Sequence, residues 1–260
     1  MMELRHIAII LSASIIMGGC SVNSSNIDNN SEINNYTLYA DLASDSFDSL
    51  SDRFQIADGW SNGSMFDCTW RKENCVFDGE QMSLVIDEDK KDGGGKYSGG
   101  EFRSKDFYGF GKYEVVMKPV SNTGVVSSFF TYTGPSDNNP WDEIDIEFLG
   151  TGTTKVQFNY FTDGEGNHEY IYELGFDASA DFHTYGFEWT SDGITWLVDN
   201  ETVYTASENI PQTPSKIMMN VWPGTGVDSW LGEYDGNTPL TACYKEICFT
   251  AYDDNDNTDE

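Results

Sequence analysis

Basic side chains are scarce in this sequence. Its 260 residues include 14 Lys and Arg against 44 Asp and Glu, which gives a formal net charge of -30. Proteins hold nucleic acid mainly by neutralising phosphates with Lys and Arg, so this balance excludes DNA and RNA as expected partners. An uncharged ligand is compatible with the acidity, and so is the simpler interpretation that the charge keeps the protein soluble.

An apolar run of membrane-spanning length is missing from the N-terminal region. The run 7–17 follows Arg5 and is too short to cross a bilayer as a helix. Residues 1–20 are therefore expected to be an export signal. Small residues before Cys20 indicate the lipoprotein type, in which this cysteine is acylated and is the only membrane contact; simple cleavage and release is the alternative. The expected location is extracellular or on the cell surface.

Composition divides the rest of the chain into three parts. Residues 21–35 are rich in Ser and Asn and are expected to form a flexible linker. Apolar and aromatic residues recur from 36 to 252, which predicts one folded domain, taken to be a monomer. Residues 253–260 are acidic and polar, and we expect them to be disordered.

Cysteine and histidine are few, with five and three copies. No CxxC pair or Cys/His cluster is present, so a zinc site is not expected. With Cys20 set aside, Cys68, Cys75, Cys243 and Cys248 remain, and an even number in an exported protein favours disulfides. Three pairings are open, and free buried thiols are the alternative.

No long stretch of the sequence keeps a helical period with caps. Short alternating runs lie between turn signals instead, as in strands. The expected strands are 113–117, 125–132, 155–161, 194–198 and 216–221, with a tight hairpin turn at Asp199 and Asn200. This pattern predicts an all-β fold, a two-sheet antiparallel sandwich with a concave face on which a long polymer can lie.

Polar and apolar residues alternate strictly from 142 to 149. Side chains at positions i, i+2 and i+4 of a strand share one face. Glu143, Asp145 and Glu147 are therefore expected to point together, while the residues between them point into the core.

The spacing of these carboxylates suits glycoside hydrolysis. The Cα atoms of Glu143 and Glu147 are expected roughly 13 Å apart, and inward-leaning side chains leave the carboxyls about 5–6 Å apart, near the ~5–5.5 Å of a retaining glycosidase. Asp145 between them can raise the pKa of one partner by repulsion and hydrogen-bond to the other. A solvated acidic strand face and a calcium site are the alternatives, although calcium loops are not regular strands.

The segment 142–150, Asp-Glu-Ile-Asp-Ile-Glu-Phe-Leu-Gly, resembles the active-site strand of bacterial lichenases, the endo-β-1,3-1,4-glucanases of glycoside hydrolase family 16. Blocks at 63–71, 127–135, 216–222 and 225–232 resemble the same family. The resemblance implies a concanavalin A-like β-jelly roll with a sugar cleft across one concave sheet. It also implies that 36–252 is a catalytic domain acting on a neutral β-glucan without a required cofactor.

By the same resemblance, Glu143 is the nucleophile and Glu147 the general acid/base of a retaining double displacement, with Asp145 tuning both. Other positions match residues with which the family contacts glucose units, through aromatic faces or hydrogen bonds. They are Asn62, Glu101, Arg103, Phe130, Tyr132, Trp141, Asn159, Asn220, Trp222 and Trp230. For each of them, packing in the core is the alternative.

Several positions depart from the family pattern. Trp60 and Phe161 stand where lichenases carry Tyr. Gly99 stands where the usual disulfide partner of Cys68 would be, so that bridge cannot form. Lys245 replaces an acidic ligand, which argues against a structural calcium, and no metal site is expected.

Other members of the superfamily are alternatives to a lichenase. Laminarinases usually insert a residue before the last Glu of this strand, whereas the spacing here is Glu-x-Asp-x-Glu. Xyloglucan enzymes share that spacing, but the blocks at 63–71 and 216–222 favour a lichenase. A non-catalytic glucan-binding jelly roll has no need of both Glu143 and Glu147. His168 and His183 are interpreted as structural.

Overall fold

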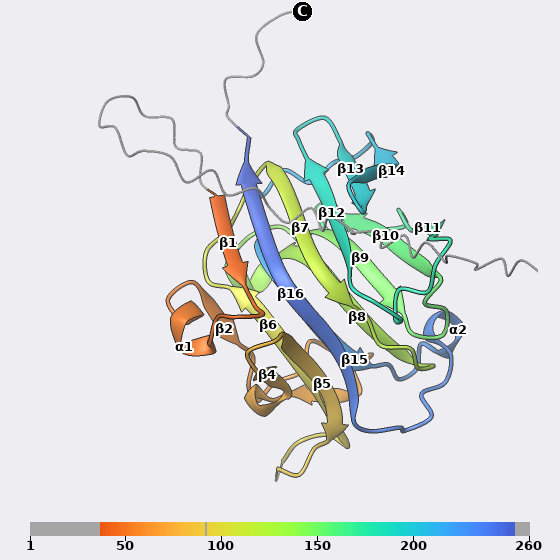
Figure 1. Ribbon diagram of the computed structural model, residues 1–260. Coiled ribbons are helices and arrows are strands. Elements are labelled where there is room, and N and C mark those ends of the chain that lie inside the picture. Colours follow the sequence, from red (N-terminus) through yellow and green to blue (C-terminus); the bar gives the residue numbers. More distant parts are fainter. Residues whose placement is uncertain (1–36, 92, 253–260) are drawn as a thin grey trace, which may run out of the picture.

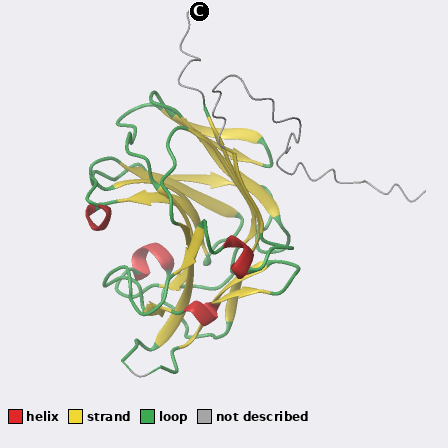
Figure 2. Cartoon of the chain, turned by 90° about the vertical axis from the view of Figure 1, so that its left-hand side faces the viewer, coloured by secondary structure: helices red, strands yellow, loops and turns green. Residues whose placement is uncertain are grey.

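A computed structural model describes residues 37–91 and 93–252 of the chain. The expected export signal, linker and acidic tail lie outside this part. Its strands form two curved layers that face each other, as Figure 1 and Figure 2 show. The predicted all-β sandwich is confirmed.

The first layer has the strand order β11-β10-β9-β8-β15-β6, with β2 paired to the outer edge of β6. Its strands are β11 (Tyr170–Glu173), β10 (Lys155–Phe161), β9 (Asp142–Leu149), β8 (Val125–Thr133), β15 (Lys216–Pro223), β6 (Tyr97–Ser104) and β2 (Phe54–Ile56). All of these pairs are antiparallel.

The second layer continues as β5-β16-β7-β12-β13-β14, with β1 on β16 and β4 on β5. Its strands are β5 (Met82–Glu88), β16 (Leu240–Ala251), β7 (Gly111–Lys118), β12 (His183–Trp189), β13 (Ile194–Val198), β14 (Glu201–Ala206), β1 (Thr37–Asp41) and β4 (Cys75–Phe77). A short pairing of β5 with β6 joins the layers, and β3 (Cys68–Trp70) runs parallel to β6.

Helices are short and peripheral in the described residues. They are α1 (Phe47–Leu50), α2 (Asp228–Leu231) and the 3-10 turns η1 (Lys72–Asn74) and η2 (Pro135–Asp137). None of the helices found within 37–91 and 93–252 is long and apolar enough to span a membrane.

The strand predictions follow from alternation and hold closely. β10 and β13 have the predicted bounds, β8 and β15 extend the predicted runs by one and two residues, and β7 extends its run by three. Asp199 and Asn200 both have positive φ angles, 48° and 69°, as a tight hairpin turn between β13 and β14 requires.

The core lies between the layers and consists of the side chains on one face of each strand. On β9, Ile144, Ile146 and Phe148 are almost fully buried. Each such side chain contributes about 1.5–3 kcal/mol through burial of apolar surface. A one-residue slip of β9 would exchange its apolar and acidic faces, so the core fixes which face presents the carboxylates.

The interpretation of four cysteines as two disulfides is wrong. Cys68, Cys75 and Cys243 are free, buried thiols, so none of the three pairings occurs. A Cβ placed on Gly99 would lie 2.9 Å from Sγ of Cys68, which confirms that a glycine occupies the position facing this thiol. Burial also raises the pKa of the Cys243 thiol, which keeps it protonated and unreactive.

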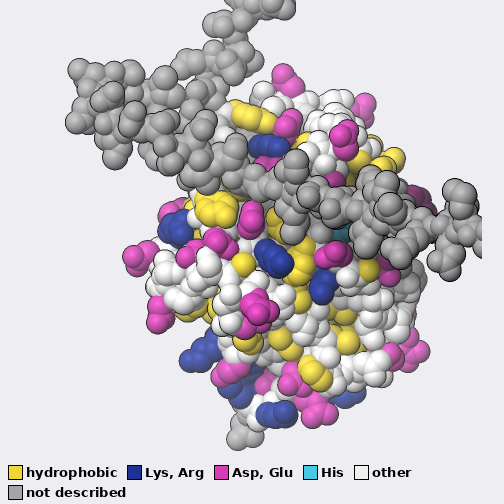
Figure 3. Space-filling view, viewed as in Figure 1, with side chains coloured by type: hydrophobic (Ala, Val, Ile, Leu, Met, Phe, Trp, Pro, Cys, Tyr) yellow, Lys and Arg dark blue, Asp and Glu magenta, His cyan; other side chains and the backbone are white. Residues whose placement is uncertain are grey.

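The acidity of the sequence appears on the surface. In Figure 3, acidic side chains are spread over the described part of the visible face, and basic ones are fewer. This distribution fits a protein that repels polyanions.

Asp142 ties the first residue of β9 to two loops. This carboxylate is 3% exposed; its Oδ1 accepts a hydrogen bond from the backbone N–H of Asp163 at 2.9 Å. Its Oδ2 accepts from the N–H groups of Gln212 and Thr213 at 3.1 and 2.9 Å. The loops that follow β10 and precede β15 are thereby held against the end of β9.

We expect Asp142→Ala to lower the free energy of unfolding by roughly 2–4 kcal/mol, because three partly buried N–H groups lose their hydrogen-bond acceptor. Urea denaturation measures the change. Glu201→Ala on the exposed strand β14 is the control and should change stability by less than about 0.5 kcal/mol. Equal effects of the two substitutions would contradict the role given to Asp142.

Candidate active site

The register of the first layer sets side chains of its concave face in rows across the strands. The row through Glu143 contains Phe161, Glu143 and Tyr132. The row through Asp145 contains Asn159, Asp145, Phe130, Met218, Arg103 and Gln55. The row through Glu147 contains Gln157, Glu147, Ser128, Asn220 and Glu101. Most residues predicted for the site therefore share one face, with the carboxylates on the strand between β8 and β10.

Glu143 is held by the indole that precedes its strand. Nε1 of Trp141 donates a 2.6 Å hydrogen bond to Oε2 of Glu143. The Trp141 ring stacks on Phe161, with centroids 4.6 Å apart and an interplanar angle of 15°. Trp141 is 39% exposed, so it presents an aromatic face to solvent at the end of the carboxylate row while its N–H orients Glu143.

Glu147 is held from the neighbouring strand. Nε2 of Gln157 on β10 donates a 2.7 Å hydrogen bond to Oε2 of Glu147. Oε1 of Gln157 accepts a 3.2 Å bond from Nε1 of Trp230 on α2. The amide of Gln157 thus has both ends fixed, and its donor end can face only the carboxylate.

Burial raises the pKa values of all three carboxyls. Burial takes the pKa of Glu143 to about 7, against hydrogen bonds from Trp141 and Asp145 that favour its charged form. Burial takes that of Glu147 to about 8, opposed by the bond from Gln157 and aided by the charge of Glu143. The pKa of Asp145 lies well above its usual range because burial and two flanking carboxylates disfavour its charge.

Different protonation states follow for the three groups. Asp145 keeps its proton and donates it in a hydrogen bond to Glu143. Hydrogen bonds from Trp141 and Asp145 favour the charged form of Glu143, whereas only the bond from Gln157 favours that of Glu147, so Glu143 is the member of the row better placed to be charged. The arrangement can therefore supply a carboxylate and a carboxylic acid side by side on one strand.

Glu101 is the centre of a second polar cluster on the concave face. It is fully buried on β6, and its Oε2 accepts from Nδ2 of Asn62 at 2.8 Å and of Asn220 at 3.4 Å. Asn62 is fixed in turn by a 2.9 Å bond from Nε1 of Trp70. Nη1 of Arg103 lies 3.8 Å from Oε1 of Glu101 and partly offsets the burial that raises the pKa of this carboxyl.

Two aromatic residues that were predicted to contact glucose units are too buried for their ring faces to pack against a sugar. Trp222 is 3% exposed, because the Phe66 ring lies 4.1 Å from it, and Phe130 is 7% exposed. By contrast, Trp60 is 40% exposed and stacks at 5.0 Å over the Arg103 guanidinium. The structure therefore adds Trp60 to the exposed aromatic residues of this face.

Sequence reasoning missed Gln157, Ser128 and Met218 as members of the site. Gln157 lay within the predicted strand 155–161 and shares its face with Asn159, so the same alternation could have found it. Ser128 donates a 2.7 Å bond to Oδ1 of Asn220, a contact that depends on the pairing of β8 with β15. No signal along the chain predicts that pairing.

His168 and His183 both lie in packing contacts rather than beside the carboxylates. His168 stacks on Tyr160 and bonds to its carbonyl oxygen, and His183 pairs with Asp199, as expected for structural residues. The Lys245 ammonium lies 4.3 Å from the centre of the Phe182 ring. A cation in that place does not fit a calcium site.

Comparison with known proteins places the chain in a family. Residues 62–238 match the model of glycosyl hydrolases family 16. A β-glucanase of Acetivibrio thermocellus is 58% identical over 197 residues, covering 76% of this chain and 58% of the relative, so the chain spans little more than half of that protein. A β-glucanase of Paenibacillus polymyxa is 57% identical over 204 residues, 77% of this chain and 84% of the relative.

Solved structures give the same result. A prokaryotic β-1,3-1,4-glucanase (lichenase) from a mouse hindgut metagenome is 51% identical with a TM-score of 0.80, covering 83% of this chain and 99% of the other. The β-glucanase of Bacillus licheniformis is 52% identical with a TM-score of 0.78, covering 83% and 98%. With its concave face and carboxylate strand, the chain belongs to glycosyl hydrolases family 16.

Proposed function

We propose that this protein is a retaining endo-hydrolase of mixed-linkage β-1,3-1,4-glucan. The observation that carries the proposal is the set of three carboxylates on one face of β9, with a separate hydrogen-bond donor for each outer member. The related solved structure described as a β-1,3-1,4-glucanase supports the choice of substrate.

Glu143 acts as the nucleophile and Glu147 as the general acid/base. Two donors, Trp141 and Asp145, favour the charged form of Glu143, whereas one donor, Gln157, favours that of Glu147. Glu147 protonates the departing glycosidic oxygen while Glu143 attacks the anomeric carbon and forms a glycosyl-enzyme. Glu147, now ionised, takes a proton from water, which hydrolyses this intermediate with net retention.

The straight course of β9 favours this substrate over laminarin. β9 pairs with β8 and β10 without a register shift, although shifts occur at β13–β14 and β7–β16. The strand therefore has no bulge before Glu147, in line with the Glu-x-Asp-x-Glu spacing. Xyloglucan enzymes share that spacing, and a substrate assay distinguishes them.

The assay compares barley β-glucan, laminarin, carboxymethylcellulose and xyloglucan by release of reducing sugar. We expect activity to be highest on the mixed-linkage glucan, with a β-anomer appearing first in proton NMR. An α-anomer formed first, or activity confined to laminarin or xyloglucan, would sink the proposal.

Glu143→Gln and Glu147→Gln should each lower kcat by roughly 10³-fold or more, because one loses the nucleophile and the other the acid. In alanine variants assayed with an activated substrate, azide should rescue Glu143→Ala with an inverted product and Glu147→Ala with a retained one. Interchanged rescue would exchange the two roles.

These glutamine variants should not be less stable than the parent protein. Burial raises the folded-state pKa of both carboxyls, to about 7 for Glu143 and about 8 for Glu147. Each protonated carboxyl therefore contributes stability fully below about pH 4, and this contribution is lost as the pH rises through the raised pKa. A glutamine side chain stays neutral at every pH, so the variants do not lose this stability at high pH. Thermal unfolding at pH 8 and at pH 4 measures it, and a variant that is unfolded at pH 8 would contradict the assignment.

The pH dependence should separate the two hydrogen-bond donors. kcat/KM is expected to be bell-shaped, since activity needs Glu143 charged and Glu147 protonated. Trp141→Phe removes a donor that favours ionised Glu143 and should move the acid limb up by about one pH unit. Gln157→Met should move the alkaline limb up instead. Shifts of both limbs in both variants would argue against separate roles.

A further inference from the structure

Side chains of the second layer reach across the core to the backbone of the carboxylate rows. Nε1 of Trp196 on β13 donates a 3.1 Å hydrogen bond to the carbonyl oxygen of Asp145 on β9. The hydroxyl of Tyr244 on β16 donates a 3.0 Å bond to the carbonyl oxygen of Ser128 on β8. Both donors therefore come from beneath the concave face and bond to residues that stand in the rows of Asp145 and Glu147.

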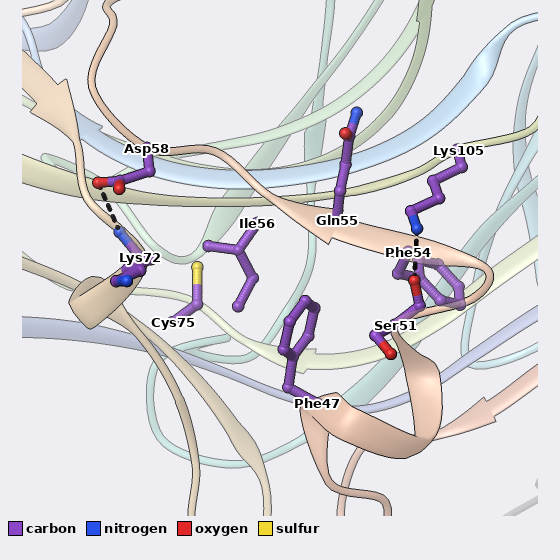
Figure 4. Close-up of a pocket in the computed structure, with 9 residues that line it drawn as sticks. All are labelled: Phe47, Ser51, Phe54, Gln55, Ile56, Asp58, Lys72, Cys75 and Lys105. Atoms are coloured by element: carbon purple, nitrogen blue, oxygen red, sulfur yellow. Dashed lines mark hydrogen bonds between the residues drawn. The ribbon is translucent and has the colours of Figure 1, made fainter.

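A weaker contact of the same kind is made further along the sheet. Cys75 of β4 lines the hollow beside β2 that Figure 4 shows, and its thiol donates to the carbonyl oxygen of Glu101 at 3.5 Å. Glu101 lies in the same row as Ser128. Side-chain donors thus reach the backbone of β9, β8 and β6 at residues of the site.

Packing holds the two stronger donors in place. Trp196 is fully buried, and the rings of Phe158 and Tyr204 both stack on it, with centroids 5.5 Å away and interplanar angles of 22° and 28°. Contact with two rings keeps the indole in one orientation. Burial raises the pKa of Tyr244 well above its usual range, so its hydroxyl keeps its proton and remains a donor.

Strand pairing alone does not fix the height of β9 above the core. The hydrogen bonds of β9 to β8 and β10 run within the sheet and set its register there. Movement perpendicular to the sheet is opposed by the groups beneath it, and Trp196 bonds to the backbone of the central carboxylate in that direction. A shift of this backbone would change the distance between the carboxyls of Asp145 and Glu143.

We propose that Trp196 and Tyr244 are positioning residues for the reaction, which act through Asp145 and Ser128. This inference rests on the proposed function. Trp196 keeps Asp145 where its carboxyl donates a hydrogen bond to Glu143, so that the nucleophile is ionised.

Tyr244 acts on the part of the face that is expected to bind glucose units. Oγ of Ser128 donates a 2.7 Å bond to Oδ1 of Asn220, and Nδ2 of Asn220 lies 3.4 Å from Oε2 of Glu101. Movement of the Ser128 backbone would displace this series of bonds, and the expected consequence is weaker binding of the substrate.

The ionisable groups around Asp145 come from several elements. Burial and the charges of Glu143 and Glu147 on β9, and of Glu169 before β11, raise the pKa of Asp145. Burial and the charges of Glu143 and Asp137 raise the pKa of Tyr132 on β8. Replacing Trp196 leaves all of these charges in the protein, so a changed pH profile reports movement of Asp145.

Steady-state kinetics of Trp196→Phe and Tyr244→Phe over a range of pH test the proposal. We expect Trp196→Phe to lower kcat by roughly tenfold with little change of KM. The acid limb of kcat/KM should move up by about half a pH unit, because Glu143 is ionised less easily when Asp145 donates poorly. Tyr244→Phe removes one oxygen atom and should raise KM by roughly threefold.

Matched controls come from the same layer. Trp189 on β12 is 1% exposed and donates a 2.9 Å bond to the carbonyl oxygen of Pro211, outside the carboxylate rows. Trp189→Phe should lose about as much stability in thermal unfolding as Trp196→Phe, but should keep kcat and the pH profile. Tyr185 is fully buried, and its hydroxyl has no hydrogen-bond partner within the described residues, so Tyr185→Phe should keep the parent KM.

The proposal is overturned for Trp196 if kcat and the pH profile of its variant match those of Trp189→Phe. It is overturned for Tyr244 if KM of its variant matches that of Tyr185→Phe. Tyr244→Phe, which differs from the parent by one atom, keeps the proposal testable if Trp196→Phe does not fold. Each variant is compared with the parent on whichever β-glucan the parent cuts, so an error in the proposed substrate is detected separately.

Discussion

Three carboxylates on one face of β9 repel one another, and the surrounding side chains of the concave sheet compensate for this repulsion. Glu143, Asp145 and Glu147 cannot all be charged at neutral pH in a buried row. The middle group keeps its proton and becomes a donor, and each outer group receives a bond from a different direction. Trp141 directly precedes β9, and Gln157 lies on the neighbouring strand β10, so groups from both sides are needed to stabilise the row of carboxylates.

The opposite face of β9 supplies the rigidity that this arrangement needs. Ile144 and Ile146 are buried between the layers, and the indole N–H of Trp196 on β13 bonds to the backbone carbonyl of Asp145. The second layer thereby holds the strand at its central carboxylate. Because β9 lies between two paired strands without a bulge, the alternation that buries the isoleucines also presents the acids.

Features with a local cause could be predicted from the sequence, and features that depend on strand partners could not. Alternation gave the bounds of β10 and β13, and it gave the common face of Glu143 and Glu147. The bond between Gln157 and Glu147 requires the register of β10 on β9, which is not encoded in either segment alone. The number of cysteines failed to predict disulfides for the same reason. A disulfide needs two cysteines that the fold brings together, whereas the Cys68 thiol lies against a glycine of the neighbouring strand.

Buried polar atoms without hydrogen bonds gather around the carboxylate rows. Among the described residues, five buried side-chain atoms lack a hydrogen bond, and three of them belong to Glu101, Arg103 and Asn159 on the concave face. Each such atom lowers the stability of the unliganded protein, typically by about 1–3 kcal/mol. Oε1 of Glu101 lies 3.8 Å from Nη1 of Arg103, so the attraction between their charges offsets part of this loss. All three residues belong to the rows that contain Asp145 and Glu147, so the concave face gives up stability at the place where the carboxylates lie.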